Sequence, residues 1–129
     1  MKRFSILCCF LGLLMTVSCA DDSNPVGTPA LFIRAANVST TAFTSLVLNF
    51  RDGRQQVYGA LAVAEKTRFR EVDEAYPVVG VTVEAEGEVY QFTPADYSIY
   101  DPLDVGNYTY ELALDVDQNS VIVTLVEEE

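Results

Sequence analysis

The sequence contains no histidine and no tryptophan, and its three cysteines all lie within the first nineteen residues. Residues 20–129 therefore carry neither a thiol nor an imidazole. Ser-His-Asp and Cys-His catalysis, and zinc binding by cysteine and histidine, need those side chains, so both are excluded there. Because no disulfide is available, an apolar core must stabilise the fold, and about 100 residues can bury enough surface for one domain.

Positive charge is scarce as well. The chain has 8 lysine and arginine residues against 19 aspartate and glutamate residues. Two of the basic residues are Lys2 and Arg3, and without them six remain against 19 acids, a net charge of about −13. Such a surface repels nucleic acid and anionic lipid headgroups, so we expect no nucleic-acid partner.

The N-terminus has the pattern of an export signal. Lys2 and Arg3 are followed by a nearly unbroken apolar run, residues 4–17. This run is shorter than the roughly 20 apolar residues that a membrane-spanning helix needs. A basic start, a short apolar segment and small residues at its end are typical of a secretory signal peptide.

The end of that segment, Thr16-Val17-Ser18-Cys19, resembles the lipobox of bacterial lipoproteins. The resemblance implies cleavage after Ser18 and acylation of Cys19, although a large aliphatic residue is usual where Thr16 stands. Ala20 after the cysteine implies the outer membrane, on a side that the sequence leaves open. An ordinary cleaved signal peptide and an uncleaved anchor are the alternatives. The predicted organisation is a signal peptide over residues 1–18, a lipidated cysteine and flexible tether over 19–29, and one domain over 30–129.

The domain itself is predicted to be all-β, because no stretch keeps a helical period and short alternating segments are separated by turn residues. Asp52-Gly53 and Glu86-Gly87 suit tight hairpin turns, and a third hairpin is expected around residues 118–119. The expected cross-strand neighbours are Leu48–Val57, Val83–Tyr90 and Leu114–Val123. Residues 94–105, between two prolines, are expected to cross the molecule without regular structure.

Residues 104–110, Asp-Val-Gly-Asn-Tyr-Thr-Tyr, resemble the D-x-G-x-Y-x-C stretch of immunoglobulin domains. The resemblance implies an Ig-like antiparallel β-sandwich of about seven to eight strands, with Tyr108 as a tyrosine corner whose hydroxyl bonds to the backbone upstream. Tyr110 stands where the cysteine would be, which argues against a true immunoglobulin. Asn37-x-Ser39, the alternating Leu46, Leu48 and Phe50, and Tyr58-Gly59-x-Leu61 are similar to small Ig-like domains of uncharacterised bacterial lipoproteins. This resemblance spans most of residues 30–128. A small β-barrel and a transthyretin-like sandwich remain alternatives.

Lys66, Arg68 and Arg70 are the only concentrated positive charge. Alternation along a strand would place the three on one face, where they could dock an anionic partner. They could equally be met by neighbouring carboxylates, in which case each pair would contribute only about 0–1 kcal/mol.

Tyr97 and Tyr100, in the irregular crossing, are candidate partner contacts, either for protein or for stacking on sugar rings. The Asp115-x-Asp117-x-Asn119 pattern lacks the glycine and glutamate that a calcium loop requires, so we interpret it as a turn. No catalytic residue, metal or cofactor is predicted. We therefore expect a non-enzymatic envelope lipoprotein, anchored in the membrane by lipid, that binds or assembles with another envelope protein. The alternative is a carbohydrate-binding module at the cell surface.

Overall fold

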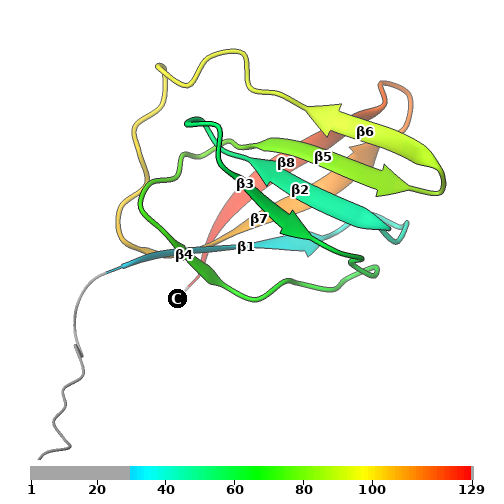
Figure 1. The fold of residues 1–129 in the computed structure, drawn as a ribbon, viewed down its shortest axis with the longest axis horizontal. Helices are drawn as coiled ribbons and strands as arrows, with labels where there is room; N and C mark the ends of the chain where they lie inside the picture. The colour runs from blue at the N-terminus through cyan, green and yellow to red at the C-terminus, as the bar shows by residue number, and fades with distance from the viewer. Residues whose placement is uncertain (1–29, 129) are drawn as a thin grey trace, which may run out of the picture.

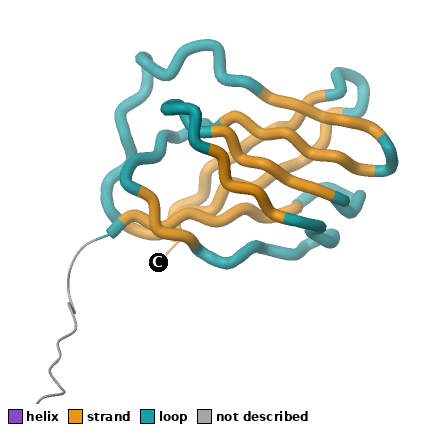
Figure 2. Tube along the Cα trace, viewed as in Figure 1, coloured by secondary structure: helices purple, strands orange, loops and turns teal. Residues whose placement is uncertain are grey.

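The computed structural model describes residues 30–128, which form eight β-strands joined by turns and loops, with no helix in that range (Figure 2). Consequently, none of these residues belongs to a helix long and apolar enough to span a membrane. The predicted all-β class is confirmed. The strands are β1 Leu31–Asn37, β2 Ser45–Asn49, β3 Gln55–Tyr58, β4 Arg70–Val72, β5 Gly80–Ala85, β6 Glu88–Phe92, β7 Gly106–Asp115 and β8 Ser120–Glu128.

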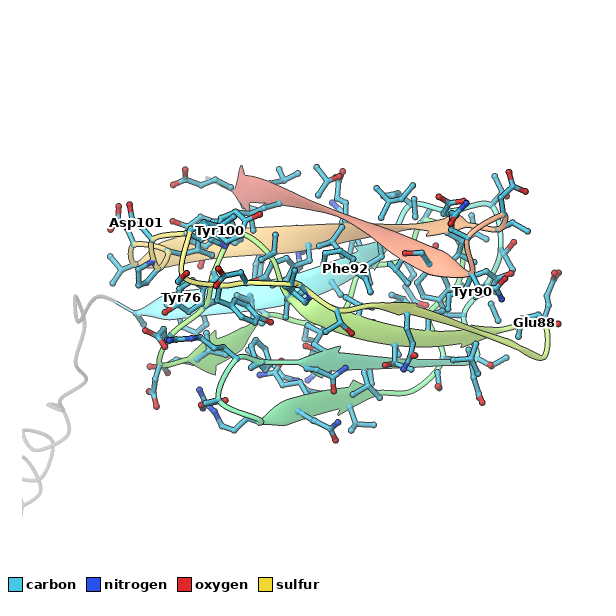
Figure 3. All side chains as sticks on the ribbon, turned by 90° about the horizontal axis from the view of Figure 1, so that it is seen from above. Tyr76, Glu88, Tyr90, Phe92, Tyr100 and Asp101 are labelled. Atoms are coloured by element: carbon cyan, nitrogen blue, oxygen red, sulfur yellow. The ribbon has the colours of Figure 1, made fainter. Side chains whose placement is uncertain are left out.

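All eight strands belong to one mixed sheet in the order β3-β2-β5-β6-β8-β7-β1-β4. The sheet curls around a single core, with β7 and β8 on one side and β2 and β3 on the other (Figure 3). Two pairs are parallel, β1 with β7 and β6 with β8, and the other five are antiparallel. This order places the first strand beside β7, unlike the ABED and CFG sheets of an immunoglobulin domain, so the Ig-like refinement is not confirmed.

The inward faces of the strands form a continuous apolar core. Alternate residues of each strand point inward, as the two-residue period of a strand requires. Ile33, Leu46, Leu48, Val83, Tyr110 and Leu112 are completely buried. A second group of side chains, which includes Phe50, Phe92 and Leu125, packs partly buried against them. Burial of this surface is the main stabilising contribution in a chain without disulfides.

The β5–β6 hairpin has the predicted register. Val83 pairs with Tyr90, Val81 with Phe92, and the two turn residues Glu86 and Gly87 both have positive φ, 52° and 78°. Positive φ at both central positions is the geometry of a type I′ turn, whose twist matches that of the flanking strands. Turn chemistry and apolar pattern therefore specify the same pairing.

The β2–β3 hairpin differs from the prediction by one residue. Leu48 pairs with Gln56, and Val57 pairs with Val47. The loop holds three residues rather than two, because the Phe50 amide donates to the Arg54 carbonyl at 2.8 Å and Gly53 takes φ 92°. A three-residue loop with glycine in the left-handed position is a common hairpin alternative. The shift exposes Val57 to solvent and buries Tyr58 in its place, which puts a larger side chain in the core.

The β7–β8 hairpin differs by two residues. Leu114 pairs with Val121 rather than Val123, because residues 116–119 form a four-residue loop. Asn119 adopts φ 49° there, and the Asp115 side chain accepts a hydrogen bond from the Gln118 amide at 3.3 Å. A two-residue slip leaves each side chain on its predicted face, so the buried face was predicted correctly although the register was wrong.

Two tyrosines of β7 connect loops to the core by hydrogen bonds from their hydroxyls to loop carbonyls. Tyr108 is 6% exposed and donates to the Asp104 carbonyl at 3.0 Å, the upstream backbone bond that the sequence predicts. Tyr110 is fully buried and donates to the Tyr76 carbonyl at 2.7 Å. Burial raises the pKa of both phenols. Each buried hydroxyl is thus satisfied, as burial of a polar group requires.

Candidate functional site

The two ends of the sheet, β3 and β4, approach each other without pairing. We call this place the β3–β4 seam, formed by Gln55–Tyr58 on one side and Arg70–Val72 on the other. Side chains bridge it: the Arg70 guanidinium lies over the Tyr58 ring, 4.3 Å from its centroid. Burial raises the pKa of Tyr58, and the positive charge of Arg70 acts in the opposite direction. The sheet is closed here by a cation–π contact and not by backbone hydrogen bonds.

A groove opens beside this contact. It encloses about 210 Å³ and is lined by Phe50, Arg54, Gln55, Gln56 and Val72. That volume is below the roughly 300–1,000 Å³ of pockets that enclose a small molecule. The groove is therefore better suited to a side chain or a strand laid along it than to an enclosed ligand.

The backbone of β3 is open along this groove. In an antiparallel pair, residues alternate between bonding to the partner strand and pointing away from it. Since Phe50 bonds to Arg54, the next bonded residue of β3 is Gln56, and the N–H and C=O groups of Gln55 and Val57 point to the open edge. The four residues Gln-Gln-Val-Tyr carry no charge and no proline. Charges and prolines are the usual protection of an edge strand, so this edge is open to another strand.

Arginines lie around the seam. Arg54 lines the groove and pairs with Asp52 at 2.7 Å, and the Arg54 backbone N–H lowers the pKa of that carboxyl. Arg51 lies in the same hairpin loop and donates to the Tyr76 hydroxyl at 3.0 Å. Across the seam, Arg68 and Arg70 lie just before and at the start of β4. The acid-bearing β5–β6 and β7–β8 turns lie at the opposite end of the molecule from the β2–β3 loop (Figure 1).

The three basic residues singled out in the sequence do not share a face. Ile33 pairs with Arg70, but Ala36 pairs with Lys66, so one extra residue interrupts the alternation between them. At this bulge the Ala35 amide donates a hydrogen bond to the Thr67 hydroxyl, at 3.0 Å, and not to a backbone carbonyl. As a bulge shifts the alternation by one, Arg70 turns toward the seam and Lys66 toward the outer face. The predicted single-faced stripe is therefore wrong.

Within residues 30–128, the same three residues have no carboxylate within ion-pair distance. In residues 30–128 the ion pairs within 4.0 Å are Arg34–Glu128 and Arg54–Asp52. Lys66, Arg68 and Arg70 are exposed and belong to neither pair. Lys66 contributes to the lowered pKa of Glu128, whose main cause is a hydrogen bond from Thr109. The condition under which neighbouring acids would already occupy the basic cluster is not met within this range.

The tyrosines do not line up as a platform. Five of the seven are buried, namely Tyr58, Tyr76, Tyr90, Tyr108 and Tyr110. Tyr97 and Tyr100 are half-buried in the irregular crossing, and Tyr97 packs edge-on against Tyr76 with centroids 5.5 Å apart. Tyr100 lies toward the same end of the molecule as Tyr76, far from Glu88 (Figure 3). Within residues 30–128 there is thus no row of exposed coplanar rings for sugar stacking.

Of the remaining predicted sites, some lie outside the described residues and others lie within them. Ser18 and Cys19 lie outside the described residues. Asp115 is the last residue of β7 and Asn119 the last residue of the β7–β8 loop, as the turn interpretation requires. No group of three or more acidic, cysteine or histidine side chains that could hold a metal was found in residues 30–128.

The open seam was missed by the sequence analysis. The Gln-Gln-Val-Tyr segment was predicted to form one strand of a hairpin. The local sequence does not indicate whether the other edge of this strand pairs with a further strand. The signal that could have drawn attention to it is Arg51 and Arg54 flanking Asp52-Gly53. With Arg68 and Arg70, they make up four of the six basic residues in residues 20–129.

Comparison with known proteins finds a similar fold but no matching family. No family model matches the chain, and no curated protein does either. A solved structure described as the NMR structure of the protein from Eubacterium rectale aligns with a TM-score of 0.55 at 19% identity, covering 83% of this chain and 98% of that one. Identity this low shows similarity of fold alone. The described part of the chain is thus an all-β domain whose fold is similar to that of at least one bacterial protein.

Proposed function

We propose that this protein is a non-enzymatic binding module of the bacterial cell envelope, tethered to the outer membrane through an acylated Cys19, that holds another envelope protein. The observation that supports it best is that Arg68 and Arg70, beside the open seam of a strongly acidic chain, are exposed and have no carboxylate of residues 30–128 within 4.0 Å. Charges arranged in this way steer association with an oppositely charged partner. Within residues 30–128, no row of exposed aromatic rings favours the carbohydrate alternative.

The tether is proposed from the N-terminal sequence and is tested separately. Several acyl chains hold a protein firmly, since each buried CH₂ contributes about 0.8 kcal/mol. Cys19→Ala should abolish acylation, and the chain should move to the aqueous phase of a detergent separation. A variant that stays in the detergent phase contradicts lipid anchoring through this residue.

The binding role is tested by reversing one charge. The full-length chain, affinity-tagged in its own membrane and cross-linked there, should yield one partner reproducibly, and Arg68→Glu should lower that yield at least about fivefold. The melting temperature should hardly move, because Arg68 is exposed and surface substitutions usually stay within about 0.5 kcal/mol. Lys66→Glu, on the face opposite Arg70, is the matched control and should lower the yield less. Unchanged capture with a large loss of stability rejects the role.

A further inference from the structure

The open edge of β3 and its surroundings define what could bind there. An added strand needs free backbone donors and acceptors, and Gln55 and Val57 supply them along the edge. The residues on the two sides of this edge differ. Arg54, Gln55 and Gln56 line the groove, and Tyr58, on the same strand face as Gln56, is buried in the core. Val57, 63% exposed, faces the outer surface next to Val47.

From this arrangement, and resting on the proposed function, we infer that the partner contributes an extended acidic segment that pairs with β3 as an additional strand. The segment alternates carboxylate and aliphatic side chains. Its carboxylates face the groove, where they meet Arg70 and share Arg54 with Asp52, and its aliphatic side chains lie beside Val57. Because a strand alternates its two faces, one segment satisfies both requirements only with this two-residue pattern.

A second copy of this chain fits the edge poorly. Pairing β3 with β3 would bring the same arginines face to face, and two strongly acidic bodies repel each other. It would also give Arg54 and Arg70 no carboxylate of the partner strand, since β3 is uncharged. Charge complementarity therefore selects an acidic segment of another protein.

The test uses a labelled peptide of about ten residues, the upper length of ordinary strands, that alternates glutamate and valine. Its binding to the full-length chain in detergent is followed by fluorescence anisotropy. Binding should saturate and weaken with added salt, because the exposed charges are screened. A peptide with the same composition but with its glutamates and valines in separate blocks should bind at least about tenfold more weakly. A lysine–valine peptide should not bind.

Backbone pairing is tested from both sides. Val57→Pro removes the outward N–H and should weaken binding at least about tenfold, whereas Val57→Thr keeps it and should bind within about twofold of the unaltered chain. An exposed edge tolerates proline better than an interior strand does. If Val57→Pro does not fold, N-methylation of alternate peptide amides removes the matching donors without altering the protein. An N-methylated peptide that binds as well as the unmodified one overturns strand addition.

The two proposals fail differently. If no acidic peptide binds while Arg68→Glu still lowers partner capture, strand addition is wrong and the binding role stands. If neither the peptide nor the charge reversal has an effect, both are rejected. Self-association of the chain through β3, detected as a concentration-dependent increase in mass that Val57→Pro abolishes, also overturns the inference.

Discussion

The two edge strands of the sheet, β3 and β4, differ in the features that prevent another strand from pairing with them. β4 is three residues long, carries Arg70 and Glu71, and is preceded by a bulge at residues 67–69. Short length, charge and bulges are the usual devices that prevent another strand from adding to an edge. β3, with four residues, is also short, but it carries no charge and no proline, ends in the buried Tyr58 and faces a groove. β3 is therefore the less protected of the two edges, and this difference is the reason for proposing that another strand adds there.

The largest expected effect compares what each edge contributes to the core. Tyr58→Ala removes a buried ring and its contact with Arg70, and should cost about 3–5 kcal/mol in the free energy of unfolding. Val72→Ala removes two buried carbon atoms from β4 and should cost about 1.5 kcal/mol. Urea denaturation of both variants gives the comparison. Equal losses would mean that the two edges close the core to the same extent.

A smaller effect isolates the contact that joins the edges. Arg70→Gln removes the guanidinium over the Tyr58 ring and should cost about 0.5–1 kcal/mol, the usual size of an exposed cation–π pair. Arg68→Gln is the matched control, because Arg68 is exposed and is not among the arginines that stack on a ring in residues 30–128, which are Arg34, Arg51 and Arg70. Its unfolding free energy should stay within about 0.5 kcal/mol of the unaltered chain. If both variants lose the same stability, the contact does not hold the seam.

The smallest effect concerns the outer face of β1, β7 and β8. Glu128 accepts a hydrogen bond from Thr109 at 2.7 Å and lies 3.6 Å from Arg34, and these groups lower its pKa. A carboxyl with a lowered folded-state pKa adds stability above its unfolded-state pKa, and that stability is lost as the pH falls through the folded-state value. Glu128→Gln should therefore be less stable than the unaltered chain at neutral pH, with a difference that shrinks on acidification.

Thermal unfolding at several pH values between about 3 and 7 measures this difference, across the range in which carboxyls titrate. Glu111→Gln, also on the outer face, is the matched control, because Glu111 forms no ion pair within 4.0 Å in residues 30–128. A Glu128→Gln difference that is constant with pH would contradict the role of Glu128.

The sequence predicted local pairing best where turn chemistry and side-chain size agreed. Glu86-Gly87 specified the β5–β6 register, whereas Asp52-Gly53 also fits a three-residue loop, and burial of Tyr58 favoured that loop. Alternation predicted the faces of β7 and β8 even though the loop length was wrong.

The pairing of strands that are distant in the sequence could not be predicted. The bulge that separates Lys66 from Arg70 depends on pairing with β1, which lies about 30 residues away in the chain. The seam depends on the order of all eight strands, and no local pattern encodes it. The candidate site is therefore a product of topology, while the cations around it were visible in the sequence.

The most direct test of the open β3 edge is amide hydrogen exchange of the full-length chain, followed by NMR. In the free chain, the amides of Gln55 and Val57 should exchange fast, while that of Gln56, bonded within the sheet, should be protected. Addition of the alternating glutamate–valine peptide should slow Gln55 and Val57 and leave Glu71 and Val72 of β4 unchanged. Protection of Gln55 and Val57 without the peptide, or no change with it, would contradict the account.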